Sequence, residues 1–140
     1  MKFYHVAPEK EVSDIFNRGI YPNEKGEITI IVLNDNFLMN KYIFDLYAWE
    51  VLGVDIYCAF EIQQHGIEGV LSDSGIDSIF SASYKVTKQK SIDRKYLKPF
   101  KSVESYEGMG LISGVFPVEN KDKFTPTYKQ KVLDYLSEVA

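Results

Sequence analysis

The stretch FYHVAPEKEVSDIFNRGIYP, residues 3–22, decides the fold that this sequence predicts. Aromatic and aliphatic side chains at residues 2–7 indicate a short strand. Pro8 suits the first position of a helix, because its missing N–H is not needed there, and Gly19 is placed to end that helix. Three apolar residues fall on one face of the helix: Val12, Ile15 and Phe16. His5 is therefore either a half-buried histidine satisfied by the backbone or the first part of a ligand site.

Strands and helices alternate on the C-terminal side of this stretch. Residues 27–33 are β-branched and almost continuously apolar, which predicts a well-buried strand. A helix is expected to begin after the polar residues 34–36 and to end at Gly53. Further segments are predicted as strands at residues 54–62, 68–72 and 80–89, and as a short closing segment at 91–100. An apolar stripe at helical spacing predicts a terminal helix over residues 125–140.

The composition is that of a globular chain. With 140 residues, 45% of them hydrophobic and 14% aromatic, the sequence is large enough for one domain with its own core. Cys58 is alone, which excludes a disulfide framework, and with two histidines no dedicated metal centre is expected. The net charge of −4 gives no reason to expect general binding of nucleic acid. Without a signal-peptide pattern or a membrane-length apolar run, we expect a cytoplasmic protein with no membrane contact.

The order of the elements predicts an α+β fold. Helices are few, and no glycine-rich phosphate-binding loop follows the first strand, so a doubly wound parallel sheet is disfavoured. Two small packed sheets are the better expectation. Residues 1–100 carry the main unit, and residues 101–140 are assigned to the same domain as an appended hairpin and terminal helix.

Basic residues gather near the end of the main unit. A strip opposed only by Asp93 contains Lys85, Lys88, Lys90, Arg94, Lys95, Lys98 and Lys101. Such a strip either binds phosphates or the edge of a nucleic acid, or is a solvated face that protects a sheet edge.

Three segments, taken together, resemble the ADP-ribosyltransferase-like fold. Residues 3–22 are similar to its first strand, which ends in a histidine, and to the helix that follows and ends at a glycine. IIVLND (30–35) is similar to its middle strand, and SYKVTKQKSIDRKYL (83–97) to its closing motif. The segments come in the family's order within residues 3–100. The resemblance implies a split β-sheet sandwich with helices after the first and second strands and a C-terminal helix.

Members of this family bind NAD, as a substrate, in a cleft between two half-sheets and break the bond between nicotinamide and ribose. The transition state resembles an oxocarbenium ion, so the protein orients the ribose and stabilises positive charge. The resemblance implies that His5 hydrogen-bonds a ribose hydroxyl and that the backbone at Val6 and Ala7 holds the nicotinamide amide. A tyrosine often stacks on nicotinamide from the second strand, where this chain has Ile31 or Val32 and offers only apolar contact.

The closing motif departs from the family pattern at Ser83, where these transferases usually carry a glutamate. Losing such a preorganised group costs about 2.7–4 kcal/mol of barrier. A nearby loop acid, Asp77 or Asp73, is the candidate substitute, and we assign Asp77 with His5 and Ser83 to the catalytic set. Strand alternation directs Ser83 into the polar cleft and Tyr84 inward. The candidate NAD-contacting set further includes two tyrosines in the core or cleft wall: Tyr47 and Tyr84.

Three functions follow as expectations. The first is an NAD-dependent mono-ADP-ribosyltransferase that modifies a protein or nucleic acid, of the kind found among bacterial or phage effectors and toxins. The second is a degenerate module that binds NAD, ADP-ribose or a protein partner without turnover. The third is an enzyme similar to the RNA 2′-phosphotransferases, which needs arginines around the cleft, and Arg18 and Arg94 are the two arginines of the chain. Cys58 is expected in the core and His65 in a surface turn.

Overall fold

The computed structural model describes residues 1–33, 37–76, 82–100 and 114–119. Its strands and helices, in chain order, are β1 (Lys2–Pro8), α1 (Val12–Arg18), β2 (Ile28–Leu33), α2 (Phe37–Tyr47), β3 (Ile56–Ile62), β4 (Ser72–Asp73), β5 (Ser83–Thr87), β6 (Leu97–Pro99) and β7 (Val115–Pro117). Short helical turns occur at η1 (Glu9–Glu11), η2 (Ala48–Leu52), η3 (Gln64–Gly66) and η4 (Arg94–Tyr96). The fold class is therefore α+β, as the sequence predicts.

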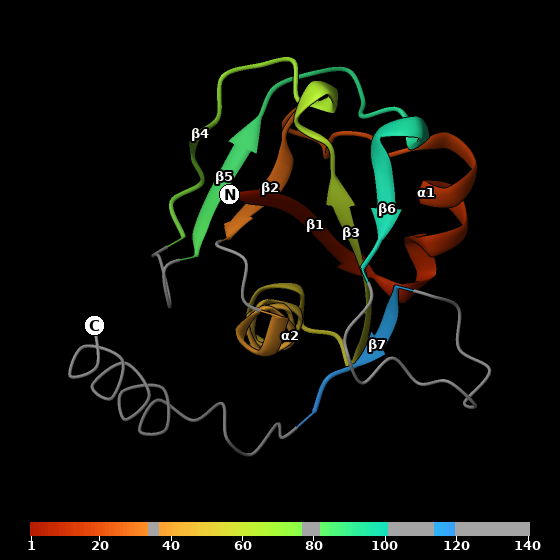
Figure 1. The fold of residues 1–140 in the computed structure, drawn as a ribbon, viewed down its shortest axis with the longest axis vertical. Helices are drawn as coiled ribbons and strands as arrows, with labels where there is room; N and C mark the ends of the chain where they lie inside the picture. Colours follow the sequence, from red (N-terminus) through yellow and green to blue (C-terminus); the bar gives the residue numbers. More distant parts are fainter. Residues whose placement is uncertain (34–36, 77–81, 101–113, 120–140) are drawn as a thin grey trace.

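The described strands form one seven-stranded sheet with antiparallel pairings (Figure 1). The order is β4-β5-β2-β1-β3-β6, and β7 also pairs with β3. Strand β3 is shared: residues 56–58 pair with β7, and residues 60–62 pair with β6. The sequence predicts two small packed sheets, whereas these strands belong to one hydrogen-bonded network because β3 joins all of its parts.

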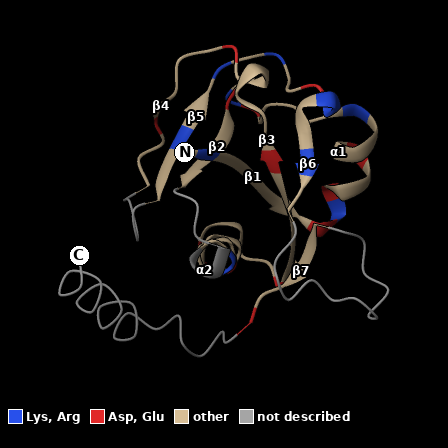
Figure 2. Cartoon of the chain, in the orientation of Figure 1, with Lys and Arg blue, Asp and Glu red and all other residues tan. Residues whose placement is uncertain are grey.

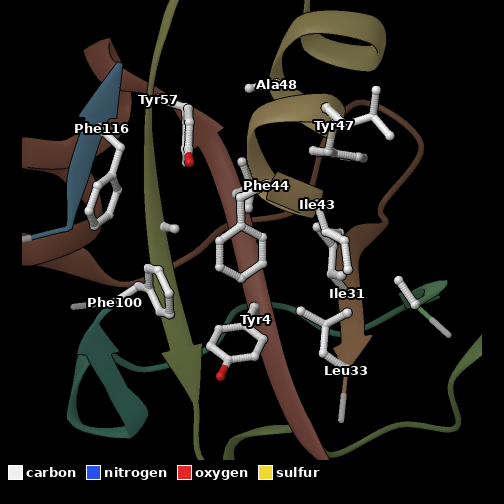
Figure 3. Packing of buried hydrophobic residues seen from close by; sticks show 14 of the residues in the cluster. Tyr4, Ile31, Leu33, Ile43, Phe44, Tyr47, Ala48, Tyr57, Phe100 and Phe116 are labelled. Atoms are coloured by element: carbon white, nitrogen blue, oxygen red, sulfur yellow. The ribbon is translucent and has the colours of Figure 1, made fainter. Parts of the chain in front are cut away.

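An aromatic core fills the space between α2 and the sheet (Figure 3). The Tyr4, Phe44 and Phe100 rings meet edge to face, with centroids 5.0 to 5.8 Å apart. Phe116 of β7 continues this cluster, with its ring centroid 5.6 Å from that of Phe100. Aromatic pairs of this geometry stabilise a core beyond the area that they bury, by about 0.5–1.5 kcal/mol each.

A second core lies on the opposite face of the sheet, beneath α1. Val12 and Ile15, from the predicted helical face, pack with strand residues such as Ile30 and Phe60. Phe16 is the third residue of that face, and its ring stands edge-on to Phe60 with centroids 5.3 Å apart. Both faces of the sheet are therefore covered, which explains why β2 reads as a continuous apolar run instead of an alternating one.

The glycines predicted to end the two helices do so. The Gly19 N–H donates to the Ile15 carbonyl at 2.9 Å, and Gly19 has φ 85° and ψ −166°. Gly53 takes the left-handed conformation, with φ 67° and ψ 35°, after η2 has extended α2. These conformations are those in which a side chain is unfavourable, so each glycine stops its helix for a backbone reason.

Several predicted boundaries need correction. Pro8, predicted at the first position of the first helix, is the last residue of β1, and α1 begins at Val12 after the turn η1. The strand expected at 68–72 is the two-residue β4, Ser72–Asp73, because only these residues pair with β5. The strand expected at 80–89 is shorter, Ser83–Thr87, among the described residues. The terminal helix expected at 125–140 lies outside the described residues. Within the described ranges, no helix has both the length and the apolar character needed to cross a membrane.

Candidate functional site

Strands β1 and β2 separate part-way along their length. Their pairing covers three residue pairs and ends at Tyr4 opposite Ile31, whereas β1 stays paired with β3 as far as Pro8. Strand β2 meanwhile remains paired with β5 back to Ile28. The two strands thus diverge, and we call the space between residues 5–8 of β1 and residues 28–30 of β2 the β1–β2 fork.

His5 lies at the apex of this fork. Its Nδ1 is 2.8 Å from the Thr29 carbonyl oxygen, and the side chain is half-buried. Because a carbonyl only accepts hydrogen bonds, the neutral imidazole carries its proton on Nδ1 and presents a lone pair on Nε2. Burial lowers the pKa of His5, and the bond to the Thr29 carbonyl opposes this shift. The backbone contact expected of a half-buried histidine is therefore present, and it leaves the second ring nitrogen as an acceptor.

The backbone of Val6 supplies a donor and an acceptor to the same fork. Ala59, opposite Val6 on β3, donates to Gly114 at 2.8 Å and accepts from Phe100 at 2.9 Å, so its polar groups point away from β1. Val6 and Ala59 are consequently a non-hydrogen-bonded pair, and the Val6 N–H and C=O point toward β2. Ala7 is the next residue and its backbone turns toward β3. An adjacent N–H and C=O suit a ligand amide, which also has one donor and one acceptor side.

The sheet distributes the predicted site residues between its two faces. The α1 face carries His5, Ala7, Val32 and Ser83, as the registers of β1, β2 and β5 require. The side chains of Val6, Ile31, Tyr47 and Tyr84 belong instead to the core beneath α2.

Tyr47 and Tyr84 are the aromatic pair on the α2 side. Their rings stack with centroids 5.7 Å apart and planes at 12°, and both side chains are buried. Burial raises the pKa of Tyr84 to about 12, and the neighbouring Tyr47 adds to the rise. Burial also raises the pKa of Tyr47, and the side chain of Thr29 opposes this rise. The predicted inward orientation of Tyr84 is confirmed.

Thr29 is the site residue that the sequence analysis missed. Its carbonyl oxygen accepts the hydrogen bond from His5, and its side chain opposes the rise that burial causes in the pKa of Tyr47. This one residue therefore connects the histidine at the fork to the tyrosine pair in the core. The available signal was a single polar residue inside the apolar run of residues 28–33, where a hydroxyl needs a partner.

Ser83 is half-buried and lies opposite Val32 on the α1 face. Asp73 pairs with Lys85, two residues further along β5, so its exposed carboxylate belongs to the same face as Ser83. The Asp73 Oδ1 accepts a hydrogen bond from the Gly75 N–H at 3.1 Å. Asp77, the acid assigned to the catalytic set, lies outside the described residues.

The remaining candidate residues behave as packing or surface residues. Cys58 is buried on the α1 face, where burial raises the pKa of its thiol to about 12, and its core placement is confirmed. His65 is exposed in η3, as expected. In the part of the chain that the structure describes, no group of three or more histidine, cysteine or acidic residues is arranged to hold a metal ion.

A buried charged cluster beneath α2 was also missed. The Lys41 Nζ is 2.6 Å from the Asp45 Oδ1, which also accepts from the Tyr57 hydroxyl at 2.5 Å. Lys41 further donates to the Pro117 carbonyl at 3.1 Å, and the Glu119 N–H donates to the Asp45 Oδ2 at 3.3 Å. Burial raises the pKa of Asp45 and outweighs the opposing effects of Lys41, Tyr57 and the Glu119 backbone. The hydrogen bonds of Lys41 and Asp45 to the backbone of Pro117 and Glu119 therefore connect α2 to the segment that contains β7.

Comparison with protein-family models, with curated proteins and with solved structures finds no match to this chain. Functional inference therefore rests on the geometry of the fork and on the sequence.

The lowered pKa of His5 makes stability depend on pH. Below the ordinary pKa of 6.5, the unfolded chain takes up a proton that the folded protein resists, so we expect the free energy of unfolding to fall as the pH drops from 7 to 5. His5→Asn keeps a donor for the Thr29 carbonyl without a titrating ring and should flatten this dependence. His65→Asn, which retains His5, should not. Urea unfolding at a series of pH values measures the difference, and equal slopes for the two variants would contradict it.

Proposed function

We propose that this protein is an NAD-dependent mono-ADP-ribosyltransferase that acts on a protein or nucleic-acid acceptor. The observation that carries the proposal is the β1–β2 fork with His5 at its apex. It brings the lone pair of His5 Nε2 and the Val6 backbone together in the residues that resemble the family's first strand. NAD is the only cofactor that the proposal requires, and it is consumed as a substrate.

The polar groups at the fork complement the two halves of nicotinamide riboside. The lone pair on His5 Nε2 accepts a hydrogen bond from a ribose hydroxyl, since Nδ1 is already used on the Thr29 carbonyl. The Val6 N–H and C=O face the fork and suit the carboxamide of nicotinamide. Of the two residues predicted for that role, Val6 is favoured over Ala7 because the backbone of Ala7 is turned toward β3.

The proposed reaction also has to stabilise positive charge at the ribose. Ser83 orients a hydroxyl but carries no charge, and the transition state of this reaction needs a negative group nearby. Asp73 is the described carboxylate on the same face of the sheet next to β5, and it takes this role in the proposal ahead of Asp77. A serine at this position also favours the second candidate, a module that binds NAD or ADP-ribose without turnover.

The test is incubation of the pure protein with NAD, followed by measurement of free nicotinamide and of mass gain on added protein and nucleic-acid acceptors. His5→Ala is expected to weaken NAD binding at least about tenfold, the cost of one lost hydrogen bond, and to abolish nicotinamide release. Asp73→Asn is expected to reduce release while NAD still protects the protein against heat. His65→Ala, an exposed histidine in η3, is the matched control.

The outcomes separate the candidate functions. Nicotinamide release that depends on His5 supports the transferase. Thermal protection by NAD without release supports the binding module. Neither release nor protection, with far-ultraviolet circular dichroism confirming a folded protein, overturns both. Release that His5→Ala leaves unchanged would show that the reaction does not use the fork.

A further inference from the structure

Phe16 of α1 and two basic residues of η4, Arg94 and Lys95, line one cavity, while Arg18 ends α1 and Tyr21 follows it. Phe16 is 38% exposed and Tyr21 is 55% exposed. The Arg18 guanidinium carbon lies 5.0 Å from the centroid of the Tyr21 ring, and the Lys95 Nζ lies 5.0 Å from the centroid of the Tyr96 ring. We call the following set the α1–η4 surface: Phe16, Arg18, Tyr21, Arg94, Lys95 and Tyr96. Figure 2 shows basic residues, in blue, on α1 and on the turn that precedes β6.

This surface is held together by backbone contacts. Ile20, directly after α1, exchanges two hydrogen bonds with Ile92, of 2.9 and 2.8 Å. Gly19 approaches the same segment so closely that a Cβ atom on Gly19 would lie 3.0 Å from the backbone nitrogen of Arg94. Asp93, between these residues, uses its carboxylate to accept the Lys95 N–H at 2.9 Å. These backbone contacts therefore fix α1 and η4, which carry the basic side chains, relative to each other. The neighbouring acid, Asp93, caps the start of η4.

A cavity of about 230 Å³ opens within the surface. Its lining consists of Ile15, Phe16, Phe60, Leu97 and Pro99, with Arg94 and Lys95 beside them. Sites for whole drug-sized ligands occupy about 300–1,000 Å³, so this cavity suits a single flat ring. The two basic residues place positive charge beside that ring. The chemistry fits a nucleobase with a phosphate next to it.

We propose that the α1–η4 surface binds single-stranded nucleic acid. One base enters the cavity against Phe16, a neighbouring base stacks on Tyr21, and the phosphates contact Arg18, Arg94 and Lys95. Single strands are favoured over duplexes because stacking on aromatic side chains needs exposed base faces. The protein as a whole is acidic, with a net charge of −4, so binding depends on this local group. Binding here does not require NAD or the fork.

The proposal divides the basic strip that the sequence presents as one unit. Arg94 and Lys95 join Arg18 on the α1–η4 surface, whereas Lys85 lies on β5 opposite Asp73. The place of each basic residue in the fold therefore decides which of them contact the nucleic acid. Binding of the nucleic acid does not require all of the basic residues between 85 and 101.

The experiment is fluorescence anisotropy of labelled oligo(dT) and oligo(U), titrated with the full chain in the absence of NAD. Phe16→Ala should weaken binding by about 5- to 100-fold, the effect of losing one stacked base. Arg94→Ala should reduce the slope of log affinity against log salt concentration by about 0.7. Two matched controls should bind as the wild type does: Trp49→Ala, which removes an aromatic ring that is 37% exposed on η2, and Lys25→Ala, which removes an exposed lysine before β2.

Each outcome decides for or against the proposal. Loss of binding in Phe16→Ala and retention in Trp49→Ala support it. If Phe16→Ala does not fold, Phe16→Leu keeps the apolar contact without the aromatic face and is expected to show the same loss. Absence of strand binding, equal binding of duplex, or tighter binding of an acidic peptide overturns it. Because NAD is left out, these results do not test cleavage of NAD at the fork, and they bear on the transferase proposal only through the choice of acceptor.

Discussion

Gly19→Ala is expected to lower the free energy of unfolding by about 4 kcal/mol. The φ and ψ of Gly19, 85° and −166°, lie in a region essentially restricted to glycine, which costs another residue about 1–3 kcal/mol. A Cβ atom would also lie only 2.2 Å from the Ile92 carbonyl oxygen. The backbone has to move apart, which disrupts the two hydrogen bonds between Ile20 and Ile92, each worth about 0.5–1.5 kcal/mol.

Gly26→Ala separates the two causes of this loss. Gly26 also has a positive φ, 74°, but a Cβ atom there has no neighbour within 4 Å. We expect it to cost about 1 kcal/mol, from conformational strain alone. Urea unfolding of the two variants and the wild type measures the difference. Equal losses would mean that the approach of Gly19 to Ile92 does not matter for stability.

Asp45→Ala is expected to cost about 3–5 kcal/mol, the effect of removing one partner from a buried ion pair. The side chains of Lys41 and Asp45 are 13% and 5% exposed, so Lys41 would keep its charge in a poorly solvated place. Tyr57 and the Glu119 N–H would lose their acceptor at the same time. The contact that joins α2 to β7 would weaken with them. Urea unfolding monitored by tyrosine fluorescence measures the loss.

The control for this prediction is the more exposed pair formed by Lys2 and Glu61, whose charged atoms are 3.3 Å apart and whose side chains are 35% and 28% exposed. Glu61→Ala should cost no more than about 1 kcal/mol. The double variant Lys41→Met with Asp45→Leu removes both charges and should recover much of the stability. Failure of the double variant to recover would show that the hydrogen bonds to Tyr57 and Glu119, and not the isolated charge, carry the effect.

Local signals in the sequence predicted local structure. Gly19 ends the first helix, and the apolar run at 27–33 gives the buried strand, because backbone preferences and side-chain spacing act within a few residues. The prediction for Pro8 was wrong, since Pro8 is extended at the end of β1 and α1 begins only at Val12. The α+β class follows from the order of such elements. The single sheet did not follow, because it depends on β3 pairing with segments about 40 and 60 residues later in the chain.

The candidate site was predictable only in part, for the same reason. His5 was recognised from its place at the end of a predicted strand. The fork was not predicted, because it arises where β1 stops pairing with β2 and no residue type at that point indicates the end of pairing. Thr29 and Lys41 were missed because their partners come from other elements. An i, i+4 pair such as Lys41 and Asp45 is typical of a solvated helix face. Here the pair is buried, because the segment that contains β7 packs against it.

The sharing of β3 between β6 and β7 has a consequence for shortened forms of the chain. All strands from β1 to β6 lie before residue 100, so a chain that ends before residue 115 keeps them and lacks β7. Without β7, residues 56–58 present an open edge that invites pairing with another chain. In the full chain the three residues of β7 cover that edge, and Lys41 donates a hydrogen bond to the Pro117 carbonyl. A chain that ends before residue 115 is accordingly expected to aggregate more readily than the full chain.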